Sequence, residues 1–306
     1  MRSIFKDDKL EKKLKEEGYI VIPFLNQDET TILKDLFLAK CDNKDGQFYA
    51  SAHDPDLHKR NDVSNAIQSA ISKKVKTEMI DMEVLGGSFI VKPKEYNHIL
   101  QAHQDWNIVD EESFQSFNIW IPLVDTVKEN GAIMVMPKSH NWIKSFRHSS
   151  IPCAFSPVHD RLLENMLTLN IKAGYALIYN HALIHASHEN LSEQARIACA
   201  SGIKPKEAEM LFYWNNNGVV EEYDSNADFF MNENVFAGPG KLTKRKQIDY
   251  NFSEINEQKL FELSGIAPLH QAESAEAQVE DTTPLPFWKV YTPLNILREI
   301  KYRIFG

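Results

Sequence analysis

The chain has 306 residues, of which 43% are hydrophobic and 25% are charged, as in an ordinary folded globular protein. Its formal net charge of −9 gives no reason to expect a nucleic-acid partner, and its three cysteines are too widely spaced for a disulfide framework or a thiolate zinc site. No apolar run is long enough to cross a bilayer, and the N-terminus is too charged for a signal peptide, so a cytoplasmic protein is expected.

The first part of the chain predicts two helices around one strand. Residues 8–17 have the pattern of a short charged helix that stops at Gly18, and residues 19–23 (YIVIP) are typical of a strand. Asn26 followed by Glu29 is a typical helix start, and an apolar helical stripe comes after it. These elements are expected to be scaffold.

Between about residues 80 and 205, short apolar or alternating runs follow one another, separated by polar and Gly/Pro-containing stretches. This pattern favours a β-sandwich or barrel over βαβ units, so a mainly β fold with flanking helices is expected. The predicted strands are 88–93, 117–124, 132–137, 175–180 and 196–203.

The end of the chain differs in composition. Residues 1–270 are predicted to form one domain, whereas residues 271–283 are small, polar and acidic, as in a flexible linker. Residues 284–306 predict a basic amphipathic helical tail. Such a tail could contact an anionic membrane surface, but docking on its own domain or on a partner subunit is favoured. The sequence leaves the oligomeric state open.

Two histidines and an aspartate point to a metal centre. His103 and Asp105 form a His-x-Asp pair, and alternate residues of a strand project to the same side. A distant histidine, His185, would complete a set of two imidazoles and one carboxylate, which binds Fe(II) and leaves coordination positions open. His181 and His188 compete with His185 for the third position.

Arg196 strengthens this interpretation. It follows His185 by eleven positions, across a polar turn and at the start of a predicted strand, so an antiparallel neighbour could bring it near the metal. Arginine suits bidentate binding of a carboxylate, and 2-oxoglutarate presents one at its far end. The alternative, a surface ion pair, is disfavoured by the strand-like flanking sequence.

Several blocks of the chain resemble the phytanoyl-CoA dioxygenase family of iron- and 2-oxoglutarate-dependent oxygenases. The resemblance covers about residues 10–205, and one departure is Lys138, where the family often has glycine in a turn. The blocks are GYIVIPFLNQDE (18–29), Lys92-Pro93 with His103-Gln104-Asp105, NIWIPL (118–123), NGAIMVMPKSH (130–140), and LIHAS (183–187) with Asn190 and Arg196.

The resemblance implies a double-stranded β-helix, or jelly roll, with helices packed outside. It implies that His103, Asp105 and His185 bind the iron. The Leu-Ile-His-x-Ser block and its distance from Arg196 favour His185 over His181 and His188 as the third ligand. The residues that it implies for the cosubstrate pocket are Arg196 and Ser187 at the distal carboxylate, Trp120 as a lining residue, and Lys92.

The activity that the resemblance implies is hydroxylation of an aliphatic C–H of a small-molecule substrate, with Fe(II), 2-oxoglutarate and O₂, releasing succinate and CO₂. Related halogenases have a small residue in place of the carboxylate ligand, so Asp105 favours hydroxylation. Desaturation, epimerisation or cyclisation at the same iron, a zinc hydrolase, and a jelly roll that binds a metal or ligand without turnover are the alternatives. The substrate stays open between acyl thioesters, amino acids and natural-product intermediates.

Overall fold

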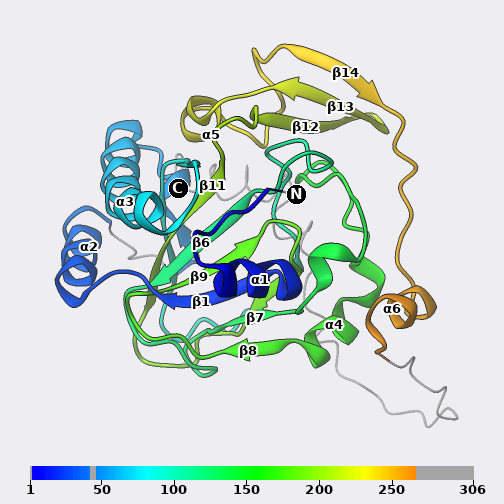
Figure 1. Ribbon diagram of the computed structural model, residues 1–306. Helices are drawn as coiled ribbons and strands as arrows, with labels where there is room; N and C mark the ends of the chain where they lie inside the picture. Colours follow the sequence, from blue (N-terminus) through cyan, green and yellow to red (C-terminus); the bar gives the residue numbers. More distant parts are fainter. Residues whose placement is uncertain (1, 42–45, 267–306) are drawn as a thin grey trace, which may run out of the picture.

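The computed structural model describes residues 2–41 and 46–266, and two antiparallel sheets form its centre (Figure 1). The larger sheet has the order β1 (Tyr19–Pro23), β9 (Tyr175–Asn180), β6 (Phe117–Pro122), β11 (Arg196–Pro205), β4 (Ser88–Lys92) and β2 (Tyr49–Ala50), and β3 (Met82–Val84) also pairs with β11. The smaller sheet has the order β5 (Leu100–His103), β10 (His185–Ser187), β7 (Ile133–Val135) and β8 (Leu167–Leu169). Together they form the jelly roll that the sequence predicts.

Strand alternation gives each sheet an inner and an outer face. On β6, Ile119 and Ile121 join an outer core, whereas Trp120 packs with Ile133 and Val135 of the smaller sheet. Side chains from both sheets therefore share one inner core. On each strand, a residue two positions before or after one of these inner residues points into the same interior. Polar side chains from the two sheets can therefore contact each other there.

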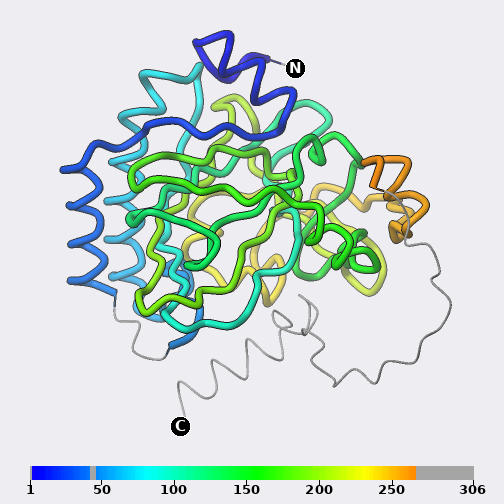
Figure 2. The backbone as a smooth tube through the Cα atoms, turned by 90° about the horizontal axis from the view of Figure 1, so that it is seen from below, coloured from blue at the N-terminus to red at the C-terminus, as the bar shows by residue number. Residues whose placement is uncertain are grey.

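Helices cover the outer face of the larger sheet. The helix α2 (Gln27–Lys40) packs against α3 (Leu57–Glu78), and α3 contacts β3, β4 and β11. Figure 2 shows the two helices side by side along one flank of the molecule. Their buried residues, including Phe37 and Ile67, belong to the outer core of the larger sheet. Burial of this apolar stripe, more than helix propensity, stabilises helices of this length.

The predicted helix signals are confirmed. The helix α1 (Asp8–Glu17) ends at Gly18, which has φ +81°. The side chain of Asn26 accepts from the backbone N–H of Glu29, and the Glu29 carboxylate accepts from the N–H of Asn26, so a complete capping box starts α2. The strand at residues 19–23 is also present as β1 and pairs with β9.

Two helices cover the outer face of the smaller sheet. Leu162 of α4 (His159–Asn165) and Leu260 of α6 (Glu257–Ser264) pack with Met134 and Ala186, which point away from the inner core. Short 3₁₀ helices lie at η1 (Ser51–His53), η2 (Ser139–Asn141) and η3 (Ser156–Val158).

A third sheet follows the jelly roll and lies at one end of the molecule in Figure 1. It consists of β12 (Leu211–Asn216), β13 (Val219–Asp224) and β14 (Lys244–Ile248), with α5 (Ala227–Asn232) between β13 and β14. The predicted linker at 271–283 and tail at 284–306 lie outside the described residues. None of the helices in the described ranges is long and apolar enough to cross a bilayer.

Candidate metal and cosubstrate site

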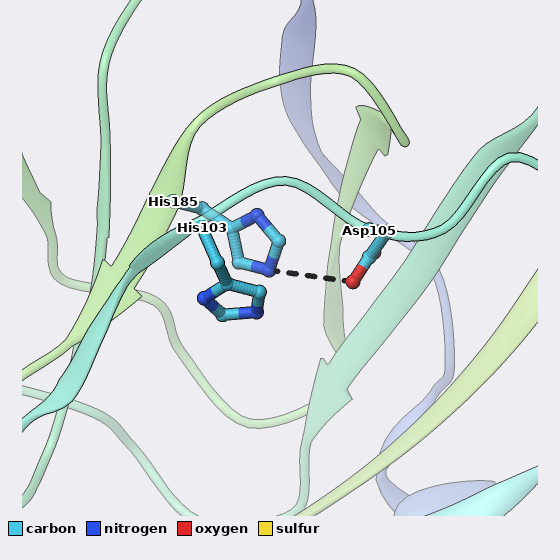
Figure 3. Close-up of side chains that lie close together, drawn as sticks. All are labelled: His103, Asp105 and His185. Atoms are coloured by element: carbon cyan, nitrogen blue, oxygen red, sulfur yellow. Dashed lines mark ion pairs between the residues drawn. The ribbon is translucent and has the colours of Figure 1, made fainter. Parts of the chain in front are cut away.

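His103, Asp105 and His185 converge between the two sheets (Figure 3). His103 ends β5 and is the register partner of His185 on β10, and the ring centroids are 4.2 Å apart. The Nε2 atom of His185 lies 3.8 Å from Oδ1 of Asp105, and one possible ligand atom from each of the three residues lies within 4.8 Å of the others. Two imidazoles and a carboxylate this close together can bind one metal ion and leave its other coordination positions open to a ligand.

Asp105 reaches the cluster from a coil. The His-x-Asp pattern predicts both side chains on one strand, but β5 ends at His103. Asn118 on β6 donates from Nδ2 to Oδ2 of Asp105 at 3.2 Å. The carboxylate is therefore oriented by the neighbouring strand and not by strand alternation alone.

Backbone carbonyl groups fix the tautomer of both imidazoles. Nδ1 of His103 lies 2.7 Å from the carbonyl oxygen of Gln101, and Nδ1 of His185 lies 3.1 Å from that of Leu183. A carbonyl oxygen can only accept, so Nδ1 carries the proton in each neutral ring. The lone pair is then on Nε2, which leaves that atom free to bind a metal. Metal-binding histidines commonly donate their other ring N–H to a carbonyl or carboxylate in this way.

The protonation states suit a cation. Burial, reinforced by the neighbouring His185, lowers the pKa of His103 to about 4, which keeps the ring neutral. Burial alone would raise the pKa of Asp105, but the histidines around it outweigh burial and lower its pKa to about 2. A neutral imidazole beside a carboxylate anion is the form that binds a metal.

The two competing histidines lie elsewhere. Nδ1 of His181 is 2.8 Å from Oγ of Ser116, and Nε2 of His188 is 2.8 Å from Oγ1 of Thr168. Each ring is thus in a hydrogen bond with a hydroxyl group outside the cluster. His185 is the histidine that the fold brings to His103.

The expected cosubstrate residues form a second group. Lys92 on β4 and Arg196 on β11 are register partners in the larger sheet. Nζ of the fully buried Lys92 donates to Oγ of Ser187 at 2.9 Å and to the backbone carbonyl of His188. The guanidinium of Arg196 lies over the ring of Trp120, 5.3 Å from its centroid. The four expected residues therefore form two contacting pairs: Arg196 and Trp120 on the neighbouring strands β11 and β6, and Lys92 and Ser187 across the two sheets.

The surroundings of Arg196 show whether this group of residues suits a carboxylate ligand. Its side chain is buried, and its Nε and Nη1 atoms have no hydrogen-bond partner among the described residues. Burial lowers the pKa of Arg196 to about 10, and burial together with Arg196 lowers that of Lys92 to about 6. A buried cation without an anion is costly, so a carboxylate that reaches Arg196 would satisfy both the charge and the unpaired donors. The residues present therefore fit the distal carboxylate of 2-oxoglutarate.

Two polar residues at the cluster were missed by the sequence analysis. The hydroxyl of Tyr179 lies 3.3 Å from Nε2 of His185, and Tyr179 is the register partner of Asn118. Asn118 is two positions before Trp120 and so shares the inner face of β6. Asn118 could have been predicted from the sequence, because strand alternation places it on the same side of β6 as Trp120. Tyr179 could not, because its position next to Asn118 depends on how β6 and β9 pair.

A cavity of about 400 Å³ opens beside His103. One wall is the segment 145–154 with Ser156 and His159, and other parts come from Trp106 and Glu254.

A family model described as "Phytanoyl-CoA dioxygenase (PhyH)" matches residues 15–198 of the chain. The chain is 30% identical over 120 residues to a phytanoyl-CoA dioxygenase 1 of Oryza sativa subsp. japonica and 28% identical over 120 residues to a phytanoyl-CoA dioxygenase of Arabidopsis thaliana. Each alignment covers 38% of this chain and 42% of the relative, so less than half of either relative is matched. Among solved structures, the non-heme alpha-ketoglutarate-dependent carbocyclase SnoK from nogalamycin biosynthesis has a TM-score of 0.49 at 17% identity, over 67% of this chain and 86% of that chain.

Proposed function

Because the chain belongs to the phytanoyl-CoA dioxygenase family, whose members use Fe(II), 2-oxoglutarate and O₂, we propose that it is a dioxygenase that hydroxylates an aliphatic C–H of a small molecule. His103, Asp105 and His185 are the proposed iron ligands. The observation that carries the proposal is the buried guanidinium of Arg196, which lies over Trp120 in the inner core and whose Nε and Nη1 have no hydrogen-bond partner among the described residues. A binding module without turnover has no need of such a second anchor.

The protein's own side chains have separate tasks in this proposal. The carbonyl groups of Gln101 and Leu183 hold the two imidazoles in the tautomer that presents Nε2. Asn118 orients the carboxylate of Asp105. This network fixes the ligand geometry before the metal arrives, which improves both affinity and selectivity.

The cosubstrate is proposed to lie across the inner face of the larger sheet. Arg196 would bind its distal carboxylate with Ser187, while Trp120 packs against the guanidinium plane. Lys92 holds Ser187 in position through the Nζ–Oγ hydrogen bond. When bound, Fe(II) and 2-oxoglutarate together supply the activation of O₂ that oxidises the substrate, with release of succinate and CO₂.

Asp105 supports hydroxylation over halogenation, because the resemblance places a small residue there in halogenases. Desaturation, epimerisation and cyclisation at the same cluster are the other outcomes of the proposed chemistry. The position of the substrate C–H relative to the metal decides among them. Product analysis with the true substrate would separate these outcomes, since hydroxylation adds one oxygen atom and desaturation removes two hydrogens.

Succinate release tests the oxygenase proposal without knowledge of the substrate. Protein loaded with Fe(II) under anaerobic conditions is mixed with 2-oxoglutarate and exposed to oxygen, and slow uncoupled turnover should give succinate. His185→Ala should abolish it, because a metal ligand is lost. Arg196→Ala should raise the KM for 2-oxoglutarate by about tenfold or more, the effect of losing hydrogen bonds to a charged group. High 2-oxoglutarate should then restore part of the rate.

His188→Ala is the matched control, because its imidazole lies near the site and bonds Thr168 instead of joining the cluster. This variant should retain succinate formation. If wild-type protein binds neither Fe(II) nor 2-oxoglutarate, the proposed function is wrong. Hydrolase activity with Zn(II) and no succinate would favour the zinc alternative.

A further inference from the structure

The coil that carries Asp105 is bonded to the loop that forms one wall of the cavity. Residues 104–108 belong to no helix or strand, so strand pairing does not hold the aspartate in place. Nε of Arg147 donates to the backbone carbonyl of Asp105 at 2.7 Å. Arg147 belongs to the segment 145–154, which lines the cavity beside His103. One proposed metal ligand is therefore joined directly to the cavity wall.

Asn107 adds further connections between the same two segments. The backbone N–H of Arg147 donates to Oδ1 of Asn107 at 2.5 Å, and Nδ2 of Asn107 donates to the carbonyl of Ser145 at 3.2 Å. Nη1 of Arg147 also donates to the carbonyl of Ser145, at 3.0 Å. Three hydrogen bonds thus cross between residues 105–107 and residues 145–147, and Arg147 takes part in two of them.

Glu111 holds the guanidinium of Arg147 in this position. Its carboxylate accepts from Nη1 at 2.9 Å and also from Nη2. The side chain of Arg147 is only 7% exposed and that of Glu111 is 24% exposed, so the pair is largely shielded from water. A bidentate pair of this kind fixes the plane of the guanidinium, which keeps Nε directed at Asp105. Glu111 therefore acts on Asp105 through Arg147.

The loop that carries Arg147 is itself held at two further points. The backbone N–H of Asn215 on β12 donates to Oγ of Ser150 at 3.0 Å, and the N–H of Ile255 donates to the carbonyl of Ala154 at 2.7 Å. A residue can fix its neighbour only when its own backbone is supported. The third sheet and the segment after it give the loop this support.

Charge alone would not favour a guanidinium at this place. A cation near a divalent metal ion weakens metal binding, and a buried cation also loses its hydration. The carboxylate of Glu111 compensates the charge of Arg147, so the pair as a whole adds none. What the pair provides is geometry, because a guanidinium can bond in its plane to a carboxylate and to a carbonyl group at the same time.

We propose that Arg147, held by Glu111, is a positioning residue that keeps the Asp105 coil in the geometry that binds the metal. Arg147 acts through Asp105 and is not itself a ligand. This inference rests on the proposed function only in taking His103, Asp105 and His185 as metal ligands. It does not depend on which oxidation follows.

Metal affinity tests the proposal on the full-length chain with Co(II) alone. The double variant Arg147→Met, Glu111→Gln replaces the pair by two neutral side chains, so the net charge near the cluster is unchanged. Its Kd for Co(II) should rise about tenfold, as is common when residues that orient metal ligands are lost. The d–d absorption of bound Co(II), which reports coordination geometry, should change too, whereas a loss of general stability would not alter it. A Kd within about twofold of the wild-type value overturns the proposal.

Lys144 and Glu112 provide the matched control. Their ion pair at 3.1 Å joins neighbouring residues of the same two loops, but the side chains are 82% and 77% exposed. The double variant Lys144→Met, Glu112→Gln makes the same chemical changes away from the Asp105 carbonyl. It should bind Co(II) like the wild-type protein. Equal weakening in the two double variants would overturn the proposal, because the effect would then not depend on Asp105.

Hydrogen exchange on the wild-type chain removes the dependence on variant folding. If the metal binds about tenfold less tightly when the Arg147 contacts are open, linkage requires the metal to disfavour that open state by the same factor. The backbone N–H of Arg147 should therefore exchange about tenfold more slowly with Co(II) bound. The paired amides of β14 serve as the reference for any general slowing. No slowing at Arg147 beyond this reference overturns the proposal.

These measurements require neither 2-oxoglutarate nor turnover. Wild-type protein that binds Co(II) but forms no succinate when loaded with Fe(II) refutes the proposed function and leaves this inference standing. Double variants that bind Co(II) like wild type refute this inference alone.

Discussion

Lys138 has a backbone conformation that suits glycine. It lies in the turn before η2, with φ +69°, where the resembling family often has glycine. A side chain in the left-handed region costs roughly 1–2 kcal/mol per residue. Lys138 has two compensating contacts with Glu17: its N–H donates to the backbone carbonyl at 2.9 Å, and its Nζ lies 3.6 Å from the carboxylate. The departure from the family pattern is therefore a local cost in stability.

Lys138→Gly should raise the free energy of unfolding by up to about 1 kcal/mol, because relief of the left-handed strain exceeds the extra entropy of glycine in the unfolded chain. Lys138→Ala keeps the same strain and serves as the control, with no gain expected. Urea unfolding of the three proteins measures the difference. Equal stability of the glycine and alanine variants would contradict this explanation.

The residue types of the cluster were predictable from sequence, but their contacts were not. His-x-Asp, the later histidine and Arg196 are visible as a spaced set. The structure places the two histidines on the paired strands β5 and β10, Asp105 in the coil after β5, and Arg196 on β11 of the larger sheet. The contacts of Asp105 with Asn118 and Arg147 depend on which strands and loops meet. Such pairings are non-local, so a single sequence does not specify them.

The strand β14 illustrates the same limit at the level of elements. Its sequence KRKQI reads as a basic cluster without strand alternation, yet it pairs with β13. Glu222 lies opposite Lys246, and Lys244 forms an ion pair with Glu221. Cross-strand pairs of opposite charge compensate for the weak strand propensity of these residues. The predicted strands of the jelly roll, by contrast, are apolar runs and are confirmed.

Glu221 should make the third sheet sensitive to acid. Hydrogen bonds from Lys244 and from the hydroxyl of Tyr223 (2.5 Å) lower the pKa of Glu221 from 4.5 to about 2. Because the pKa is lower in the folded state, this carboxylate contributes stability above about pH 4.5, and the contribution is lost as the pH falls toward 2.

Glu221→Gln should therefore flatten the decrease in the free energy of unfolding between these two pH values. Glu209→Gln is the control, because that carboxylate is largely exposed in its pair with Arg245. Urea titrations across this pH range give both slopes. If all three proteins lose stability in parallel, another carboxylate is responsible.

At the scale of the whole molecule, Arg196, whose Nε and Nη1 find no hydrogen-bond partner in the described part of the chain, should couple cosubstrate binding to stability. A ligand that binds only the folded state at about 100 times its Kd adds about 2.7 kcal/mol, or a rise in Tm of several degrees for a chain of this size. 2-Oxoglutarate should give this rise in wild-type protein. Arg196→Met removes the buried cation and should be at least as stable without ligand. Its response to the same 2-oxoglutarate concentration should be about half as large or smaller, because its Kd is expected to be raised about tenfold or more. Differential scanning calorimetry distinguishes these cases, and an undiminished response of Arg196→Met would contradict the assignment.

The loop at residues 145–154 is fastened from Asn215 and Ile255, while the cluster stands on strands of the jelly roll. Substitutions in the third sheet can therefore change the shape of the substrate cavity without changing the residues proposed to bind the metal. Relatives that share the histidines and the aspartate but differ after residue 205 should diverge in what they oxidise. Grafting residues 206–266 between such relatives, together with the loop, is the exchange that would transfer substrate preference.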